Sequence, residues 1–472
     1  MPLANQVAYN TFIQFAGKVI STIVGLFAIA IITRYLGQVG FGQYTTVVTF
    51  LSLFAVFADF GLTLTTAQTI SDPNTDQNKI LSNLFSFRLV SAFILLSLAP
   101  LIAIFLPYPP IIKLGITITT LSFFFVALNQ IFVGLFQKNL KMQIVSIAEI
   151  VGRLTLLFGV IVTVYLNYGL MGILLATIIS SAINFIVHFY YSRPLAKIKF
   201  QIDFDIWKKI FSKSWPLALT IIFNLIYLRA DILILSLVKS QADVGIYGAA
   251  YKVVDVFTAL PFMFAGIILP ILTNAWLVKD EKRFKNVLQK SFDILIILAI
   301  PLLVGTQFVA QPIMELIAGK SFAESGQVLK ILIIATTFIF LGCIFAHAII
   351  ALDKQKKIMA AYIFTAVTSL IGYLIFIPRY SYFGAAWVTV YSESVIALAS
   401  FYYVAKYSQY RPNFNQLIKS LSASLAMALA LYLIINKIPL LLALILAPVI
   451  YFIVLYFFKG ISKQDMLALL KK

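Results

Sequence analysis

The chain has 472 residues, of which 61% are hydrophobic and 11% are charged, and its mean hydropathy is +0.99. Soluble globular proteins carry about 25% charged residues, so this composition excludes a water-soluble globule and indicates an integral membrane protein. The formal net charge of +19 does not indicate nucleic-acid binding, because the positive residues are spread over short loops and form no compact basic surface. We therefore expect membrane lipid as a partner and no nucleic acid.

Apolar runs of about 20 residues, the length that crosses a bilayer as a helix, follow one another along the chain. The first run is long enough to span and no small-residue cleavage site follows it, so we expect no cleavable signal peptide. Pro261 and Pro270 inside one long run predict a bent or broken helix there. Fourteen helical spans are predicted, at 10–35, 42–70, 84–106, 111–136, 144–166, 169–191, 214–238, 244–276, 291–312, 327–350, 358–377, 382–405, 416–436 and 438–458.

Lysine and arginine are distributed unevenly between the loops on the two sides of this helical map. With the N-terminus on the cytoplasmic side, the cytoplasmic segments hold 24 of these residues and the opposite loops hold 6. The positive-inside rule predicts such an imbalance, so we expect both termini in the cytoplasm. The imbalance also supports the number of spans, because one missed span would exchange the sides of all later loops.

The longest connection, 192–213, joins the sixth and seventh predicted spans and is basic. Its charged residues are interleaved with four aromatic ones, Phe200, Phe204, Trp207 and Phe211. We therefore expect it to lie in the cytoplasmic interface as an amphipathic helix. No loop is long enough to hold an ATPase or a catalytic domain.

Short motifs recur in the two halves of the chain and indicate an internal repeat. The segments 37–44 (GQVGFGQY) and 240–247 (SQADVGIY) share Gln, Gly and Tyr at an offset of 203 residues. Two further pairs are 137–142 with 353–358 and 172–177 with 384–389. We predict an N-lobe at 1–191, a linker at 192–213, a C-lobe at 214–405 and two extra helices with a tail at 406–472. Each lobe has six spans, so the lobes would be related by an axis along the membrane normal, with a substrate path between them.

Several of these stretches together form a pattern that resembles a known family. They are Asn10, Arg34-Tyr35-Leu36-Gly37 with Gly40, Gly42 and Tyr44, Asp59-Phe60-Gly61-Leu62, and GKSFAESG at 319–326 running into VLKIL at 328–332. Over its whole length the chain resembles the Wzx-type polysaccharide flippases, a branch of the superfamily that also holds multidrug exporters and lipid II flippases. It departs from that pattern late in the second helix, where family members often carry an arginine and this chain has Thr66-Ala67-Gln68.

The resemblance implies an inner (plasma) membrane protein of a bacterium or archaeon. Such a protein flips a polyprenyl-pyrophosphate-linked glycan outward by alternating access. It implies a V-shaped exporter fold with two lobes around a central cavity. It also implies the lipid-linked glycan as a partner, with a polysaccharide polymerase and chain-length proteins as further partners.

Ionisable residues inside the predicted spans are the candidate functional residues. A charge at the centre of a span costs about 2.5–3.5 kcal/mol and should therefore face protein or water. The cations are candidate ligands for the pyrophosphate and glycan: Lys18, Arg88, Arg153, Arg229 and Lys252. The acids are candidates for charge pairing or ion coupling: Asp59, Glu149, Asp231, Asp255 and Glu393, with Asp293 near a span end.

Two pairs among these residues have helical spacing. Glu149 and Arg153 are four residues apart, and Lys252 and Asp255 are three apart, so each pair can meet on one helix face. Each pair either neutralises itself or serves the cavity.

The other cations have no such neighbour. Lys18 has no acid in its own helix and is either a cavity ligand or part of an interhelical salt bridge. Arg88 lies about one turn inside its span, where snorkelling to the interface is the alternative. Arg229 and Asp231 do not share a helix face, so we expect them to find partners elsewhere.

No catalytic site is predicted. The single Cys343 and the distant His188 and His347 leave no disulfide, no cysteine metal cluster and no nucleophile with its base. The residues GKS at 319–321 look like the end of a phosphate-binding loop, but position 314 is methionine where the motif needs glycine. We expect a transporter without a metal or cofactor, not an enzyme.

Three alternative functions stay open. The cargo could be lipid II, or the chain could be a multidrug or cation antiporter, whose cavity should be lined by acids and aromatics. A membrane-embedded glycosyltransferase or polymerase would need a sizeable extracytoplasmic loop with paired acids or arginines. The driving force is either the membrane potential, worth about 2.3 kcal/mol per charge per 100 mV, or proton or sodium coupling through Asp59, Glu149 or Asp255.

Overall fold

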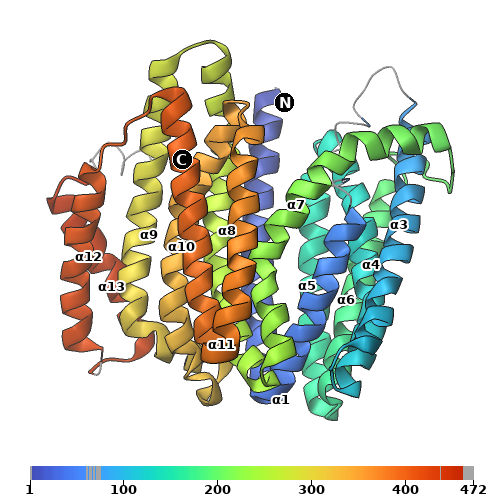
Figure 1. Ribbon diagram of the computed structural model, residues 1–472, viewed down its shortest axis with the longest axis horizontal. Coiled ribbons are helices and arrows are strands. Elements are labelled where there is room, and N and C mark those ends of the chain that lie inside the picture. The colour runs from blue at the N-terminus through green and yellow to red at the C-terminus, as the bar shows by residue number, and fades with distance from the viewer. Residues whose placement is uncertain are drawn as a thin grey trace. The chain divides into compact units, whose positions relative to one another are not determined.

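The computed structural model is all-helical over the residues that it describes (Figure 1). These are 3–59, 62, 66, 70, 76–435 and 437–460, without the side chains of 3–9, 11, 12, 213 and 215–228. The helices are α1 (Leu3–Asp59), α3 (Gln77–Phe105), α4 (Pro110–Lys138), α5 (Met142–Leu166), α6 (Gly169–Ser192), α7 (Phe204–Val238), α8 (Gln241–Leu277), α9 (Glu281–Ala318), the short 3-10 helix η1 (Lys320–Phe322), α10 (Ser325–Ala351), α11 (Gln355–Ser408), α12 (Asn415–Ile434) and α13 (Leu440–Phe457). Eleven of them are long and apolar enough to cross a membrane. The predicted all-α membrane fold is therefore confirmed.

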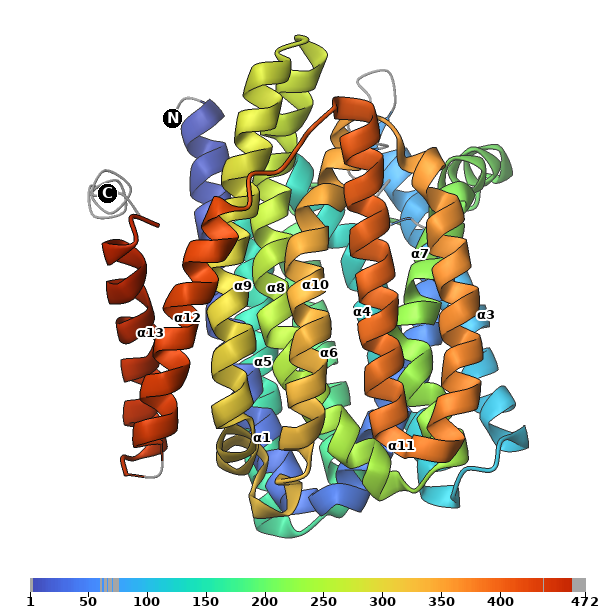
Figure 2. The ribbon, with the colours of Figure 1, turned by 60° about the vertical axis from the view of Figure 1, so that its left-hand side comes forward.

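Two of the eleven are too long for one crossing. The 57 residues of α1 and the 54 of α11 would measure about 85 and 80 Å as straight helices, against a hydrocarbon core of about 30 Å. Each contains one non-helical residue, Gly37 (φ 63°) in α1 and Ser381 (φ 49°) in α11. Figure 2 shows α11 as a hairpin. Both residues fall between predicted spans, so the number of crossings is close to the predicted fourteen.

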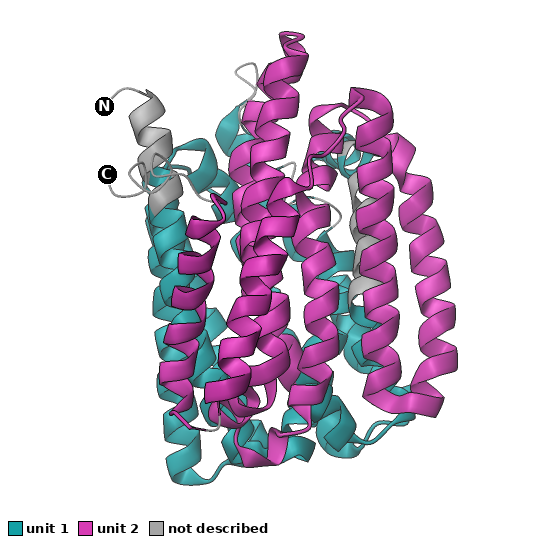
Figure 3. Ribbon diagram, turned by 90° about the vertical axis from the view of Figure 1, so that its left-hand side faces the viewer, with its two compact units in different colours: residues 1–248 teal, residues 249–472 magenta. Residues whose placement is uncertain are grey.

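The chain divides into two compact units, 1–248 and 249–472 (Figure 3). The division falls inside α8, because α7 packs against α1 and α3 and the start of α8 packs against α1 and α7. It therefore does not coincide with the predicted linker at 192–213. The helix α8 runs unbroken through Pro261 and Pro270.

Each unit has its own apolar core. In the first unit, Leu81 and Leu84 of α3 meet Ile131 and Leu135 of α4, all fully buried. These residues are spaced three or four apart, so they form one stripe on each helix. In the second unit, α12 and α13 pack against α9, and the hydroxyl of Tyr451 donates to a backbone carbonyl of α9 at 2.9 Å. The two extra C-terminal helices are thus integrated into the second unit.

The connection between α6 and α7 is not the helix that its composition predicts. Residues 196–203 form no helix, and α7 begins at Phe204. Alternate N–H groups of this segment face α3, as in an extended chain, and Asp203 itself has extended φ and ψ. The amphipathic helix expected over 192–213 is therefore wrong for the first part of that range. The quoted motif positions 60, 61, 67 and 68 and the tail 461–472 lie outside the described residues.

Candidate functional site

The first half of α1 and α5 lie along one another and carry three of the predicted charges. Successive turns of α1 contact successive turns of α5. The side chain of Asn10 accepts from the backbone N–H of Met142 at 2.9 Å, and Ser146 Oγ donates to the carbonyl of Ile13 at 3.3 Å. A Cβ on Gly17 would overlap the side chain of Ser146. The glycine therefore allows the close approach that brings the charged residues of the two helices within reach.

Lys18 forms an interhelical salt bridge on this contact. Its Nζ lies 2.8 Å from Glu149 Oε1, and the side chains are 46% and 30% exposed. Of the two alternatives for Lys18, the structure therefore shows the salt bridge. Glu149 thus pairs with a lysine of α1 and not with Arg153 of its own helix. Because both side chains are accessible, the pair can exchange partners with a ligand or with water.

Arg153 lies one turn further along α5 and is exposed. Its guanidinium packs 3.7–3.8 Å from the place where a side chain on Gly25 of α1 would begin. Among the residues that the structure describes, it forms no ion pair. The buried Tyr44 of the second half of α1 is within electrostatic range of it. We call Lys18, Glu149 and Arg153 the α1–α5 charged face, which carries one net positive charge.

Arg88 is enclosed by protein. Its side chain is 3% exposed, and its Nη1 lies 2.6 Å from Asp59 Oδ1. It also donates from Nη1 to the carbonyl of Ala58 at 3.1 Å and from Nε to that of Ala127 at 3.0 Å. The carbonyl of Ala58 thus receives donors from α3, because Ser91 Oγ also donates to it at 3.2 Å. Arg88 thus joins α1, α3 and α4 and does not show the alternative of snorkelling to the interface.

The remaining candidates of the first unit lie around α7. Asp231 is fully buried, and its Oδ2 accepts a hydrogen bond from the hydroxyl of Tyr247 at 2.7 Å. Arg229 is half-buried. Asp231 therefore connects α7 to the start of α8. As expected from its spacing, it has a partner on another helix.

Four candidates lie in the second unit. Lys252 Nζ and Asp255 Oδ2 are 4.0 Å apart on α8, with side chains 31% and 36% exposed. The expected pairing along one helix face is thus present, at the outer limit of an ion pair. Glu393 is buried in α11. Asp293 on α9 accepts a hydrogen bond from Gln289 at 2.8 Å.

The two repeat motifs lie against one another in the first unit. A Cβ on Gly42 would overlap the carbonyl of Gln241, and a Cβ on Gly245 would overlap the carbonyl of Gln38. Thr46 Oγ1 also donates to Gln241 Oε1 at 2.8 Å. The offset of 203 relates Gln38 to Gln241 and Gly42 to Gly245, so the contact is reciprocal. Sequence reasoning found both motifs but missed that they touch.

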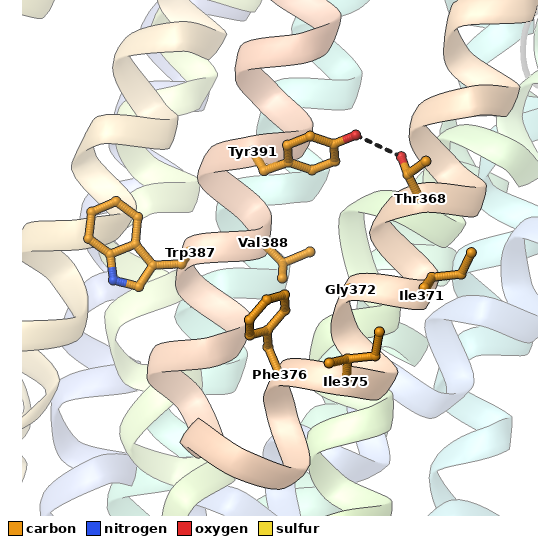
Figure 4. A pocket seen from close by; sticks show the side chains of 8 residues that line it. All are labelled: Thr368, Ile371, Gly372, Ile375, Phe376, Trp387, Val388 and Tyr391. Atoms are coloured by element: carbon orange, nitrogen blue, oxygen red, sulfur yellow. Dashed lines mark hydrogen bonds between the residues drawn. The ribbon is translucent and has the colours of Figure 1, made fainter.

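The hairpin of α11 forms an open apolar pocket of about 450 Å³. It is lined by Thr368, Ile371, Gly372, Ile375, Phe376, Trp387, Val388 and Tyr391. Figure 4 shows the hydroxyl of Tyr391 donating across one end of the pocket to Thr368 Oγ1, a distance of 3.0 Å. Its two polar side chains thus satisfy each other and no charge lines it, so this pocket suits an apolar chain and not an anionic head group.

One ring nitrogen of each histidine has a backbone partner one turn earlier in its own helix. His188 Nδ1 lies 2.9 Å from the carbonyl of Asn184, and His347 Nδ1 lies 2.8 Å from that of Cys343. Within the described part of the chain, no group of three or more His, Cys, Asp or Glu side chains is arranged to hold a metal ion.

The sequence and the fold were each compared with those of known proteins. A protein of Shigella flexneri described as an O-antigen transporter is 23% identical over 390 residues, which are 80% of this chain and 92% of the relative. The fold is that of the lipid II flippase MurJ in an inward closed conformation, with a TM-score of 0.79 at 18% identity over 96% of this chain and 99% of that one. An inward-facing multidrug resistance transporter of the MATE family has a TM-score of 0.68 at 14% identity, over 82% of this chain and 94% of that one.

The family model described as "Polysaccharide biosynthesis protein" matches residues 31–327. That range contains the Arg34 motif, both repeat segments, the connection 192–213 between α6 and α7 and most of the candidate charges. The chain belongs to the polysaccharide biosynthesis protein family.

Proposed function

We propose that the protein is a flippase that moves a polyprenyl-pyrophosphate-linked oligosaccharide from the cytoplasmic to the outer leaflet of the plasma membrane by alternating access. Membership in a polysaccharide biosynthesis family, a relative described as an O-antigen transporter and the fold of a lipid II flippase all support this function. The proposal includes cytoplasmic termini, from the loop charges, and lobe boundaries at 191 and 214. A polymerase and chain-length proteins are the partners it implies.

The observation that carries the proposal is the α1–α5 charged face. Lys18 lies eight residues into the first predicted span and Arg153 nine residues into the fifth, which places both about 12–14 Å deep in a core of about 30 Å. Charges at that depth almost always face the bundle interior or a water-filled cavity, and the accessible ones here suit a cavity. Cations there suit an anionic cargo.

The chemistry of the cargo fits this face. A pyrophosphate carries about two negative charges, and its transfer into hydrocarbon without partners is prohibitive. Arg153 offers a planar fork that binds two phosphate oxygens at once. Lys18 can turn from Glu149 to the phosphate. The prenyl chain stays in lipid throughout, so only the head group needs a polar path.

The same geometry narrows the coupling hypotheses. Asp59 is paired with buried Arg88 and is 13% exposed, whereas Glu149 is 30% exposed and beside Lys18. Glu149 and Asp255, which is 36% exposed, are therefore better placed than Asp59 for proton or sodium coupling. Without coupling, two negative charges moving outward would gain about 4–5 kcal/mol at 100 mV.

The charged face also bears on the rival functions. A multidrug or cation antiporter needs acids toward its substrate, but the α1–α5 charged face has two cations to one acid. Lipid II shares the pyrophosphate and the prenyl chain, so this face would bind it equally well. Only measuring the transport of each cargo can therefore distinguish lipid II from another lipid-linked oligosaccharide.

The test is transport in proteoliposomes of a fluorescent lipid-linked oligosaccharide, with lipid II measured in parallel. We expect Arg153→Ala to lose most of the transport while the protein folds and inserts normally. Arg379→Ala is the matched control, because Arg379 is also exposed but lies near the bend of α11. Wild-type transport by Arg153→Ala would remove the charged face from the mechanism.

A further inference from the structure

The extended segment 196–203, here called the strap, is fastened along the first turns of α3. Its alternate backbone N–H groups donate to side-chain oxygens of α3 at 2.8–3.0 Å: Lys197 to Asn78, Lys199 to Ser82, Gln201 to Ser86 and Asp203 to Asn83. Asn78, Ser82 and Ser86 are four residues apart and so form one polar row on the helix. These side-chain oxygens accept the backbone N–H groups that a neighbouring β-strand would otherwise accept.

The end of the strap is anchored by charge. Asp203 Oδ2 lies 2.9 Å from Lys79 Nζ. Asp203 Oδ1 accepts from the backbone N–H groups of Asp205 and Ile206 at 3.2 and 3.3 Å, which caps α7. The strap is therefore held in one conformation before any ligand arrives, which lowers the entropic cost of binding.

The extended backbone sorts the strap side chains into two faces. Lys197 and Lys199 lie on one face and are exposed. On the other face, Ala196 is buried in the core of the first unit and Ile198 packs against it. Further along that face, Phe200 and Ile202 are 61% and 49% exposed. The first residues of this face are thus packed in the core, and the later ones form an exposed apolar surface.

The first turns of α7 repeat this combination. Phe204 is 76% exposed, and Lys208 and Lys209 are exposed one turn later. Trp207 packs edge-on against Phe204 and against Phe87 of α3, with ring centroids 5.9 and 5.3 Å apart. The only acids in this stretch are Asp203, which is paired with Lys79, and Asp205. The surface is therefore strongly positive and has large apolar side chains beside its cations.

The strap also lies at a membrane boundary. It follows directly after α6 and lies on the first turns of α3, both of which are membrane-spanning helices. Large exposed apolar groups rimmed by cations are typical of surfaces that rest in the headgroup region. Charge complementarity selects anionic lipid as the occupant.

We propose that the strap and the start of α7 form a binding surface for anionic phospholipid. Lys197, Lys199, Lys208 and Lys209 contact the lipid phosphates, and Phe200, Ile202 and Phe204 enter the acyl region. This site is separate from the α1–α5 charged face and does not depend on the transported cargo. Each lysine near an anionic surface contributes about fivefold in affinity at low salt.

Trp207 provides a native probe for this surface. In a Trp215→Phe, Trp276→Phe, Trp387→Phe background it is the remaining tryptophan of the four. Its fluorescence would be measured in vesicles of phosphatidylcholine and phosphatidylglycerol in which one lipid at a time carries brominated acyl chains. We expect brominated phosphatidylglycerol to quench Trp207 more strongly than its molar share predicts, and the excess to fall at high salt.

Two variants locate the effect. Lys197→Gln with Lys199→Gln should lower the preference for phosphatidylglycerol by up to about 25-fold. Lys356→Gln with Lys357→Gln removes the same charge from exposed residues of α11 and should leave the preference intact. Native mass spectrometry of bound lipid, with all tryptophans present, repeats the comparison if the substituted background is unstable.

Equal quenching by both brominated lipids would overturn the proposal, as would a preference that survives loss of Lys197 and Lys199. An acidic protein that binds the strap while vesicles show no lipid preference would likewise replace it. None of these results would affect the proposed transport function, whose test depends on Arg153.

Discussion

Replacing Arg88 by methionine separates a structural cation from a cargo ligand. In the native protein Arg88 pairs with Asp59 and donates to the carbonyls of Ala58 and Ala127, with a side chain 3% exposed. Methionine fills similar space but leaves the carboxylate without this cation and the two carbonyls without this donor. Loss of one partner from a buried ion pair costs about 3–5 kcal/mol, and we expect Arg88→Met to fall in that range.

The assay is thermal unfolding of purified protein, together with its abundance in membranes. Arg88→Met should melt well below the wild type and accumulate less. The double variant Arg88→Met with Asp59→Asn should recover part of the loss, because it also removes the buried negative charge. Arg153→Met is the matched control and should melt normally, since Arg153 is exposed. An Arg88→Met protein that melts like the wild type but no longer transports would refute the structural role.

Three further outcomes are expected. Gly42→Ala should destabilise the fold by about 1–3 kcal/mol, because its methyl group would overlap a backbone carbonyl; Gly266→Ala, with open space around it, should be neutral or stabilising in the same melting assay. Ser381→Gly should raise stability by about 1 kcal/mol, because φ is 49° at this residue and a side chain disfavours that region. Hydrogen bonds from Lys79 and then the Ile206 N–H lower the pKa of Asp203 from its ordinary value of 3.8, so strap stability is retained above that pH and lost as the pH falls through the lowered pKa. The protection factors of the strap amides, which compare their exchange with the intrinsic rate at each pH, should therefore fall in acid, less so in Asp203→Asn; unchanged protection would contradict the assignment.

Features that the bilayer imposes locally could be predicted from the sequence. Lipid demands apolar runs of about 20 residues, so the spans and the positions of the bends at Gly37 and Ser381 follow from composition alone. The helical pairing of Lys252 with Asp255 follows from spacing alone. The identity of the family followed from short motifs, such as the one beginning at Arg34.

Features that depend on distant partners could not be predicted. Lys18 and Glu149 are 131 residues apart, and nothing in either helix signals the other. The strap is extended because a row of Asn and Ser on α3 accepts its N–H groups, whereas its own composition favours an amphipathic helix. Reciprocal contact of Gly42 and Gly245 with the opposing repeat likewise needs the tertiary structure, although the shared offset pointed to both positions.

The affinity for polyprenyl pyrophosphate tests the central claim most directly. It should be measured by native mass spectrometry for the wild type, Arg153→Gln and the control Arg379→Gln. Charge-assisted hydrogen bonds are worth about 1.5–3 kcal/mol, so Arg153→Gln should bind roughly 10–100-fold more weakly, while Arg379→Gln binds as the wild type does. Equal affinity of all three proteins would contradict the assignment of the α1–α5 charged face as the pyrophosphate site.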